Sequence, residues 1–307
     1  MDTKSDISSL YNELIERFVK WAKTRPDIKL AVVVGSRARA NQTADEWADL
    51  DILIVTSNPE YYLTETEWIV NIGDYWLTFL EQTAVGNETE RRILFEGGLD
   101  VDLAIFPLET LQNFAHKGIP PQFKAQAADT FGRGARILLD RDGLLAQFLK
   151  LIPPTEKVSS HPPTESEFLQ VINDFLYHTV WTAKHLRRGE LWWAKMCSDC
   201  YMQRLLLQMI EWHARAMHGW DYDTWFRGRF LEKWADPKII EGLHSVFAHY
   251  DTDDVSRALM EEFRLFHWIA QETAAKLNYQ YPRKADGHVM EWVENCLSWK
   301  KLDKNTY

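Results

Sequence analysis

The stretch that decides the fold is residues 30–56, LAVVVGSRARANQTADEWADLDILIVT. Its first five residues, 30–34, form a short apolar run rich in β-branched side chains, which predicts a buried strand. Gly35 and Ser36 end that run at a turn. A second apolar run, 52–55, predicts a neighbouring strand after a polar connection.

Two aspartates stand at the start of this second strand. Asp49 and Asp51 are two positions apart, so their side chains point to the same side of the strand. Two neighbouring carboxylates repel each other, and removal from water makes their charged forms more costly. A divalent cation that prefers oxygen ligands, such as Mg²⁺, would relieve this repulsion. The sequence therefore predicts a metal site here.

A third carboxylate lies in a later apolar run. Residues 99–106, LDVDLAIF, predict a strand that returns from a turn at the two glycines before it. Asp102 lies among its hydrophobic residues, where an unpaired carboxylate is costly unless it binds a metal. We expect Asp102 beside Asp49 and Asp51. Asp100 is the alternative, because strand parity puts it on the same face.

Length and patterning predict two domains and an α+β fold. The first, residues 1–152, is expected to be a mixed-sheet domain, and the second, residues 164–307, an α-helical bundle. Residues 153–163, which are rich in proline, read as the linker. Thr164 and Glu167 form a capping-box pattern at the start of the helical part.

Apolar spacing predicts the individual elements. In the first domain we expect helices over residues 7–24 and 60–70, strands over 75–80, 91–95 and 136–139, and one helix on each side of the last strand. In the second domain five or six helices are expected, with helical spacing over residues 168–179, 191–217 and 255–277.

Composition narrows the class of partner. The 35 basic and 45 acidic residues give a net charge of −10, which disfavours nucleic acid and suits a small cationic substrate. Three cysteines give no disulfide framework, which favours the cytoplasm. The N-terminal residues lack the pattern of a signal peptide, and no apolar run is long enough for a membrane helix, so no membrane partner is expected.

The Gly-Ser turn followed by Asp-x-Asp resembles the signature of the DNA polymerase β-like nucleotidyltransferases. A closer resemblance is to the aminoglycoside 6-adenylyltransferases, the streptomycin-modifying enzymes. Its motifs are GSRA at 35–38, the acidic and tryptophan pattern at 45–51, VDLAIFPLE at 101–109 and NDF at 173–175. The resemblance implies a nucleotidyltransferase domain followed by a helical domain. A monomer or weak homodimer is expected.

The resemblance also implies the reaction. AMP would pass from ATP to a hydroxyl of an aminoglycoside, with streptomycin the leading acceptor and pyrophosphate released. Two Mg²⁺ ions would be held by Asp49, Asp51 and Asp102, and Asp102 could also take the hydroxyl proton. Gly35 and Ser36 would hold the triphosphate through the turn.

Several further residues are candidates for contacts with the substrates, and each could instead be an ordinary surface residue. The cations expected to add positive charge at the triphosphate are Arg37, Arg39, Lys184 and Arg229, and each is otherwise a solvated side chain. Met196 stands where the family has an acid that helps hold the drug, so Asp199, three residues on, could serve as catalytic base instead. Otherwise Asp199 belongs to a solvated helix face.

Two other functions fit the same sequence. A nucleotidyltransferase of this kind could act on another small hydroxyl compound or on a protein side chain. A non-catalytic protein could keep the fold without the reaction. The intact carboxylates at 49, 51 and 102, together with Gly35 and Ser36, favour an enzyme.

Overall fold

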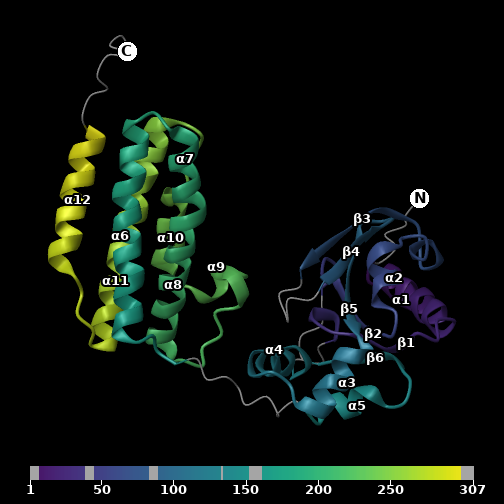
Figure 1. The fold of residues 1–307 in the computed structure, drawn as a ribbon. Helices are drawn as coiled ribbons and strands as arrows, with labels where there is room; N and C mark the ends of the chain where they lie inside the picture. The colour runs from purple at the N-terminus through teal and green to yellow at the C-terminus, as the bar shows by residue number, and fades with distance from the viewer. Residues whose placement is uncertain (1–6, 39–44, 83–88, 133, 152–160, 299–307) are drawn as a thin grey trace. The chain divides into compact units, whose positions relative to one another are not determined.

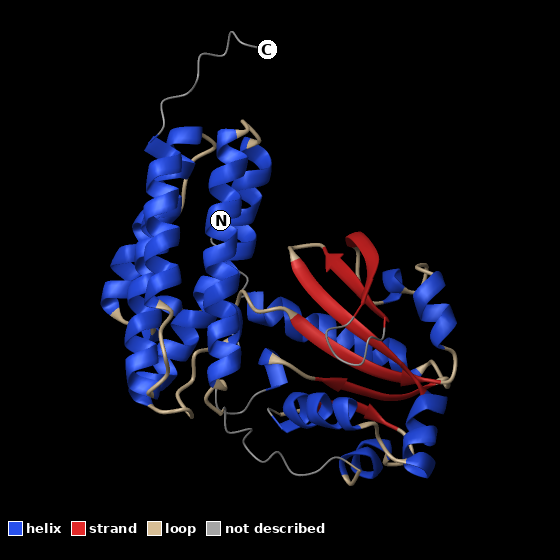
Figure 2. Ribbon diagram, turned by 60° about the vertical axis from the view of Figure 1, so that its left-hand side comes forward, coloured by secondary structure: helices blue, strands red, loops and turns tan. Residues whose placement is uncertain are grey.

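The computed structural model describes residues 7–38, 45–82, 89–132, 134–151 and 161–298. The chain divides into two compact units, Met1–Val158 and Ser159–Tyr307, and the division falls inside the predicted linker. Among the described residues, strands lie in the first unit alone and the second is helical (Figure 2). The α+β fold class predicted from the sequence is confirmed, whereas the domain boundaries stay a prediction.

The first unit is built on a six-stranded mixed sheet with the order β3-β4-β5-β2-β1-β6 (Figure 1). Of the described strand pairs, β2 with β5 is parallel and the others are antiparallel. The strands are β1 (Ile28–Val33), β2 (Leu50–Thr56), β3 (Tyr75–Gln82), β4 (Thr89–Phe95), β5 (Leu99–Pro107) and β6 (Arg136–Asp140). All the strands expected from the sequence are present.

Alternating side chains give this sheet two separate cores. On one face, α1 (Ile7–Lys23) and α2 (Pro59–Thr64) pack against alternate residues of β1, β2, β4 and β5. On the other face, residues of β1, β2 and β5 form a second core with α3 (Leu108–Lys117), α4 (Pro121–Gly132) and α5 (Leu144–Leu149). Figure 1 shows these two groups of helices on opposite sides of the sheet.

Three details of the first unit differ from the expected elements. The helix expected over 60–70 ends at Thr64, and a 3-10 turn, η2 (Ile69–Asn71), follows it. Trp68, which is buried, precedes η2 and donates from its indole nitrogen to the carbonyl of Glu65, 2.8 Å away. Two helices, α3 and α4, precede β6 where one was expected. Gly118, at a φ of +83°, ends the first of them.

The second unit is a bundle of helices with its own core. Its elements are α6 (Glu165–Arg187), α7 (Leu191–Met196), a π-helical segment η3 (Cys197–Met202), α8 (Gln203–His218), η4 (Phe226–Gly228), α9 (Leu231–Trp234), α10 (Pro237–Val246), α11 (Thr252–Leu277) and α12 (Arg283–Ser298). The predicted capping box at Thr164 and Glu167 is present at the start of α6. None of the described helices combines the length and apolarity needed to cross a bilayer.

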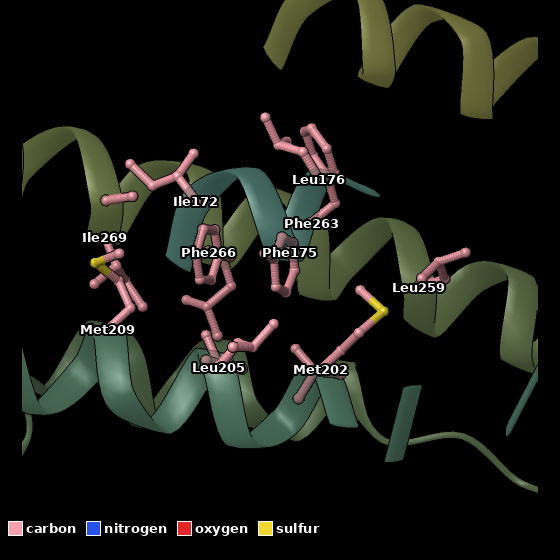
Figure 3. Close-up of a cluster of buried hydrophobic side chains, with 14 of the residues drawn as sticks. Ile172, Phe175, Leu176, Met202, Leu205, Met209, Leu259, Phe263, Phe266 and Ile269 are labelled. Carbon is pink, nitrogen blue, oxygen red and sulfur yellow. The ribbon is translucent and has the colours of Figure 1, made fainter. Parts of the chain in front are cut away.

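Aromatic packing lies at the centre of this bundle. The rings of Phe175 and Phe266 stack with centroids 3.8 Å apart, and Figure 3 shows them facing each other between α6 and α11. Met202, Leu205 and Met209 close the cluster from the side of η3 and α8 (Figure 3). These apolar positions lie in the segments where the sequence has helical spacing.

Candidate active site

Three aspartates meet where β2 and β5 begin. β2 and β5 run in parallel with Asp51 directly opposite Asp102, and Asp49 precedes β2. One carboxylate oxygen from each of the three lies within 4.8 Å of the others. Asp102 is buried, whereas Asp49 and Asp51 are partly buried. The structure therefore brings together the three carboxylates that the sequence singled out.

Burial and neighbouring negative charges make the charged forms of Asp51 and Asp102 costly. Burial, followed by the charges of Asp49 and Asp102, raises the pKa of Asp51 to about 7. Burial also raises the pKa of Asp102 to about 6, although the neighbouring Arg92 guanidinium acts in the opposite direction. A cation bound between the carboxylates would remove much of this cost.

The chemistry of the three side chains fits Mg²⁺ or a similar ion. All three offer carboxylate oxygens, the hard ligands that Mg²⁺ and Mn²⁺ prefer over sulfur or imidazole. Their spacing lets one ion contact more than one of them. The residues present thus match the group that the sequence predicted for this place.

Gly35 allows the backbone to pass close to Asp51. Its φ is +67°, a left-handed conformation that residues with a side chain rarely adopt. A Cβ atom at this position would lie 2.0 Å from Oδ2 of Asp51. The turn therefore needs glycine for its conformation and also for the space that it leaves to the carboxylate.

Ser36 follows at the start of a short 3-10 turn, η1 (Ser36–Ala38). Its hydroxyl oxygen is buried and has no hydrogen-bond partner among the described residues. A buried hydroxyl without a partner is costly in the free protein. The Ser36 hydroxyl is therefore suited to donate a hydrogen bond to a ligand atom such as a phosphate oxygen.

Arg37 has protein partners in the structure. Its guanidinium donates to the carbonyls of Ala48 and Asp49 and lies over the ring of Tyr11, 3.7 Å from the centroid. These contacts tie η1 to the residues just before β2. The predicted contact between Arg37 and the triphosphate stays a prediction, and Arg39 lies outside the described residues.

The alternative third carboxylate, Asp100, contacts Tyr11 instead of the other aspartates. Its side chain is exposed and accepts a hydrogen bond of 2.8 Å from the hydroxyl of Tyr11. Asp100 does not belong to the cluster formed by the other three aspartates. The structure therefore favours Asp102 over Asp100, as the sequence did.

Sequence reasoning missed the charged residues of the neighbouring strands. Arg92 on β4 forms ion pairs with Asp102 and with Glu81 and Glu90. Burial raises the pKa of Glu90 despite the nearby Arg92 guanidinium. The available signal was the alternation of Glu90 and Arg92 on a strand next to the one that carries Asp102.

The remaining candidates lie in the helical unit. Asp199 is part of η3 and forms an ion pair of 2.7 Å with Lys195. The ammonium of Lys184 lies 5.5 Å from the ring centroid of Trp292, and the guanidinium of Arg229 lies 5.6 Å from that of Phe230. The roles assigned to Asp199, Lys184 and Arg229 stay predictions.

A comparison with protein families identifies the chain. The sequence model of the streptomycin adenylyltransferase family matches residues 10–296, almost the full length. The chain belongs to this family. Membership makes it a nucleotidyltransferase of the class that transfers AMP to an aminoglycoside, and it covers both structural units. The family resemblance stated from the sequence motifs is confirmed.

Individual relatives carry similar names. An aminoglycoside 6-adenylyltransferase of Bacillus subtilis (strain 168) is 23% identical over 284 residues, covering 90% of this chain and 94% of its own. The enzyme of the same name from Campylobacter jejuni is 22% identical over 275 residues, covering 88% and 90%. A crystal structure of an aminoglycoside 6-adenyltransferase from Bacillus subtilis aligns with 96% of this chain and 100% of its own, at 19% identity and a TM-score of 0.43.

Proposed function

We propose that this member of the family transfers AMP from ATP to a hydroxyl group of streptomycin or a close relative and releases pyrophosphate. The observation that carries the proposal is the cluster of Asp49, Asp51 and Asp102 beside the Gly35–Ser36 turn. Attack on a phosphorus atom requires alignment and charge neutralisation more than covalent help from the protein. A carboxylate cluster next to a glycine-serine turn provides for both.

Asp49, Asp51 and Asp102 would hold two Mg²⁺ ions in this proposal. The ions would neutralise the triphosphate oxygens and favour the in-line attack of the acceptor hydroxyl. Ser36 would donate its unsatisfied hydroxyl to a phosphate oxygen, and Gly35 would let the chain approach the nucleotide. In this arrangement the cost of burying three carboxylates and one hydroxyl is offset when the substrates bind.

The transfer itself involves one bond formed and one broken. The acceptor oxygen bonds to the α-phosphorus, and the bond from that phosphorus to the β-phosphate oxygen breaks, so that pyrophosphate leaves. The hydroxyl proton would pass to Asp102. In the described contacts Arg92 pairs with Oδ2 of this carboxylate, and no protein donor contacts Oδ1. Asp199 remains the alternative base.

The acceptor is proposed from charge and from the names of the relatives. The chain carries a net charge of −10, and an acidic site concentrates a cationic acceptor. The two relatives above are named as 6-adenylyltransferases of aminoglycosides. We extend that specificity to this chain, together with a cytoplasmic location and a monomeric or weakly dimeric state.

The test is a panel of acceptors incubated with α-labelled ATP and Mg²⁺. Label should appear in streptomycin or a relative, with one pyrophosphate released for each AMP transferred. Label on another small hydroxyl compound or on a protein would move the proposal to a different acceptor. No transfer to any acceptor would contradict it.

The matched variant is Asp49→Asn, which keeps size and shape and removes one metal-binding charge. It should lower the transfer rate by at least about a hundredfold while the protein keeps its circular dichroism spectrum. A variant that folds and transfers AMP at the wild-type rate would show that Asp49 does not bind the metal used in the reaction.

A further inference from the structure

A charged row crosses the sheet beside the three aspartates. Arg92 lies directly opposite Asp102 across the β4–β5 pair, and Asp102 lies directly opposite Asp51 across the β5–β2 pair. Directly opposed residues share a face of the sheet and contact one another. An arginine is therefore the neighbour of Asp102 on the side away from Asp51.

The guanidinium of Arg92 contacts three carboxylates through three different nitrogens. Its Nε lies 2.9 Å from Oε2 of Glu81 and its Nη2 lies 3.0 Å from Oε1 of Glu90. Its Nη1 donates to Oδ2 of Asp102. The buried Nε forms no hydrogen bond within the described residues, so Glu81 attracts the guanidinium by charge, and the planar group lies between the three carboxylates with its Nη1 hydrogen-bonded to Asp102.

Arg92 offsets the repulsion between the two glutamates, Glu81 and Glu90. Glu81 and Glu90 are directly opposed across the antiparallel β3–β4 pair. Like charges in this position destabilise a sheet unless a cation lies between them. Their side chains are 52% and 13% exposed, so Glu90 is also largely removed from water. Arg92 supplies the cation.

We propose that Arg92, anchored by Glu81 and Glu90, is the positioning residue that holds Asp102 in the orientation in which it binds metal. The inference rests on the proposed function of the aspartate cluster as a metal site. Arg92 engages Oδ2 of Asp102, and the described contacts include no protein donor to Oδ1. Carboxylates that bind metals are held in this way by outer hydrogen bonds, whose loss weakens metal binding.

Simple charge arithmetic predicts the opposite result, which makes the test decisive. Removing a positive charge beside a cation site should strengthen metal binding through Coulomb attraction alone. Removing a positioning residue should weaken it. We expect Arg92→Gln to weaken Mn²⁺ binding by roughly tenfold or more, measured without nucleotide by the electron paramagnetic resonance signal of free Mn²⁺.

Arg92→Lys separates charge from geometry. It keeps the positive charge and loses the planar fork, so a positioning role predicts Mn²⁺ binding between that of the wild type and Arg92→Gln. Wild-type affinity in Arg92→Lys, or tighter binding in Arg92→Gln, would overturn the proposal. Arg264→Gln is the matched control, because Arg264 also pairs with two glutamates, Glu261 and Glu294, and should leave Mn²⁺ affinity unchanged.

Glu81→Gln tests the anchor with little risk to folding, because its side chain is half exposed. This change should weaken Mn²⁺ binding when Arg92 is present and cause no further loss in the Arg92→Gln background. An equal loss in both backgrounds would mean that Glu81 acts through its own charge, against the proposal.

The failure of the metal site itself has a different signature. A wild-type protein that binds no Mn²⁺, or Asp51→Asn that binds it as tightly as the wild type, would contradict the proposed function. If the wild type binds Mn²⁺, and Asp51→Asn weakens this binding while Arg92→Gln does not, only the proposed role of Arg92 is contradicted.

Discussion

At Gly35 a single hydrogen atom decides whether the turn and the carboxylate can coexist. Gly35→Ala should destabilise the fold by about 1–2 kcal/mol through its φ of +67°. It should also displace Asp51, because the new Cβ would lie 2.0 Å from Oδ2. We expect AMP transfer to fall at least about tenfold, measured as kcat together with thermal unfolding.

Gly189→Ala is the control for this strain. Gly189 has a φ of +77°, and a Cβ atom added there would meet no described atom within 4 Å, so the change carries the backbone cost without a clash. Its activity should equal that of the wild type. If Gly35→Ala also kept full activity, the close approach to Asp51 would have no role in the reaction.

Ser36→Ala should separate stability from substrate binding. The hydroxyl is buried without a described partner, so its removal should leave the free energy of unfolding unchanged or raise it by about 1 kcal/mol. The KM for ATP should rise about tenfold, because a hydrogen bond to a charged phosphate is lost. Unfolding in denaturant and initial-rate kinetics measure the two effects.

Ser198→Ala gives the contrast. The Ser198 hydroxyl donates to Oε2 of the buried Glu262 at 3.2 Å, so this variant should lose about 1–3 kcal/mol of stability. A Ser36→Ala variant that loses as much stability would show that the hydroxyl has a protein partner, and an unchanged KM would remove its role with ATP.

The raised pKa of Asp51, about 7, predicts how stability depends on pH without metal. Between the ordinary pKa of an aspartate and 7, the folded protein binds more protons at this site than the unfolded chain does. Stability from this group is therefore present at low pH and lost as pH rises through 7. Asp102, with a pKa of about 6, acts in the same direction.

Thermal unfolding between about pH 5.5 and 8 in a chelator checks this expectation. The Tm should fall as pH rises, and Mg²⁺ should remove most of the fall by favouring the charged carboxylates. Asp51→Asn should show a weaker dependence on pH. If the Tm in chelator rose over this pH range in both the wild type and Asp51→Asn, the raised pKa of Asp51 would be contradicted.

Residue types and short spacings were enough to find most of the candidate site. Asp49, Asp51 and Asp102 stand out because carboxylates are rare in apolar strands, and the structure brings them within 4.8 Å of one another. Glu81, Glu90 and Arg92 did not stand out, because charged residues on a strand usually face water. Only strand pairing shows that these three meet.

At the scale of elements, local signals predicted the helices better than their interruptions. The capping box at Thr164 and the spacing over residues 191–217 are local, and both helices are present. The π-helical segment η3 divides the second of these helices. The buried positions Ala194, Ser198 and Met202 are four residues apart, a spacing that an uninterrupted α-helix also gives, so the sequence did not indicate the π-helical segment.

The start of α12 depends on one buried carboxylate. Asp286 accepts a hydrogen bond of 2.7 Å from the Tyr281 hydroxyl, and its Oδ2 lies 2.7 Å from Nδ1 of His267 on α11. Asp286→Ala would remove the carboxylate from both contacts, so it should destabilise the helical unit by about 2–3 kcal/mol. Denaturant unfolding followed by far-UV circular dichroism measures the loss.

Glu261→Ala serves as the comparison for Asp286→Ala. It removes an exposed ion pair with Arg264 and should cost less than about 1 kcal/mol. Equal losses in the two variants would show that burial does not strengthen the contacts of Asp286.

At the scale of the whole molecule, the chain has separate hydrophobic cores in its two units. The residues of the helical core all come after position 160, and those of the two sheet cores all come before it. Separate cores predict two unfolding transitions in calorimetry. Mg²⁺ should raise only the Tm of the sheet unit, and Asp286→Ala should lower only that of the helical unit. One transition that responds to both changes would contradict this independence.

The amino-acid sequence by itself determined the class of the fold, the family and the identity of the carboxylates, because alternation, helical spacing and the Gly-Ser turn are properties of neighbouring residues. Tertiary structure alone decided that Asp51 lies opposite Asp102 and that Tyr11 donates a hydrogen bond to Asp100. It also decided that Arg92 forms ion pairs with carboxylates on β3, β4 and β5. These contacts depend on the register between strands and on the docking of a helix, which are set by the packing of segments far apart in the chain.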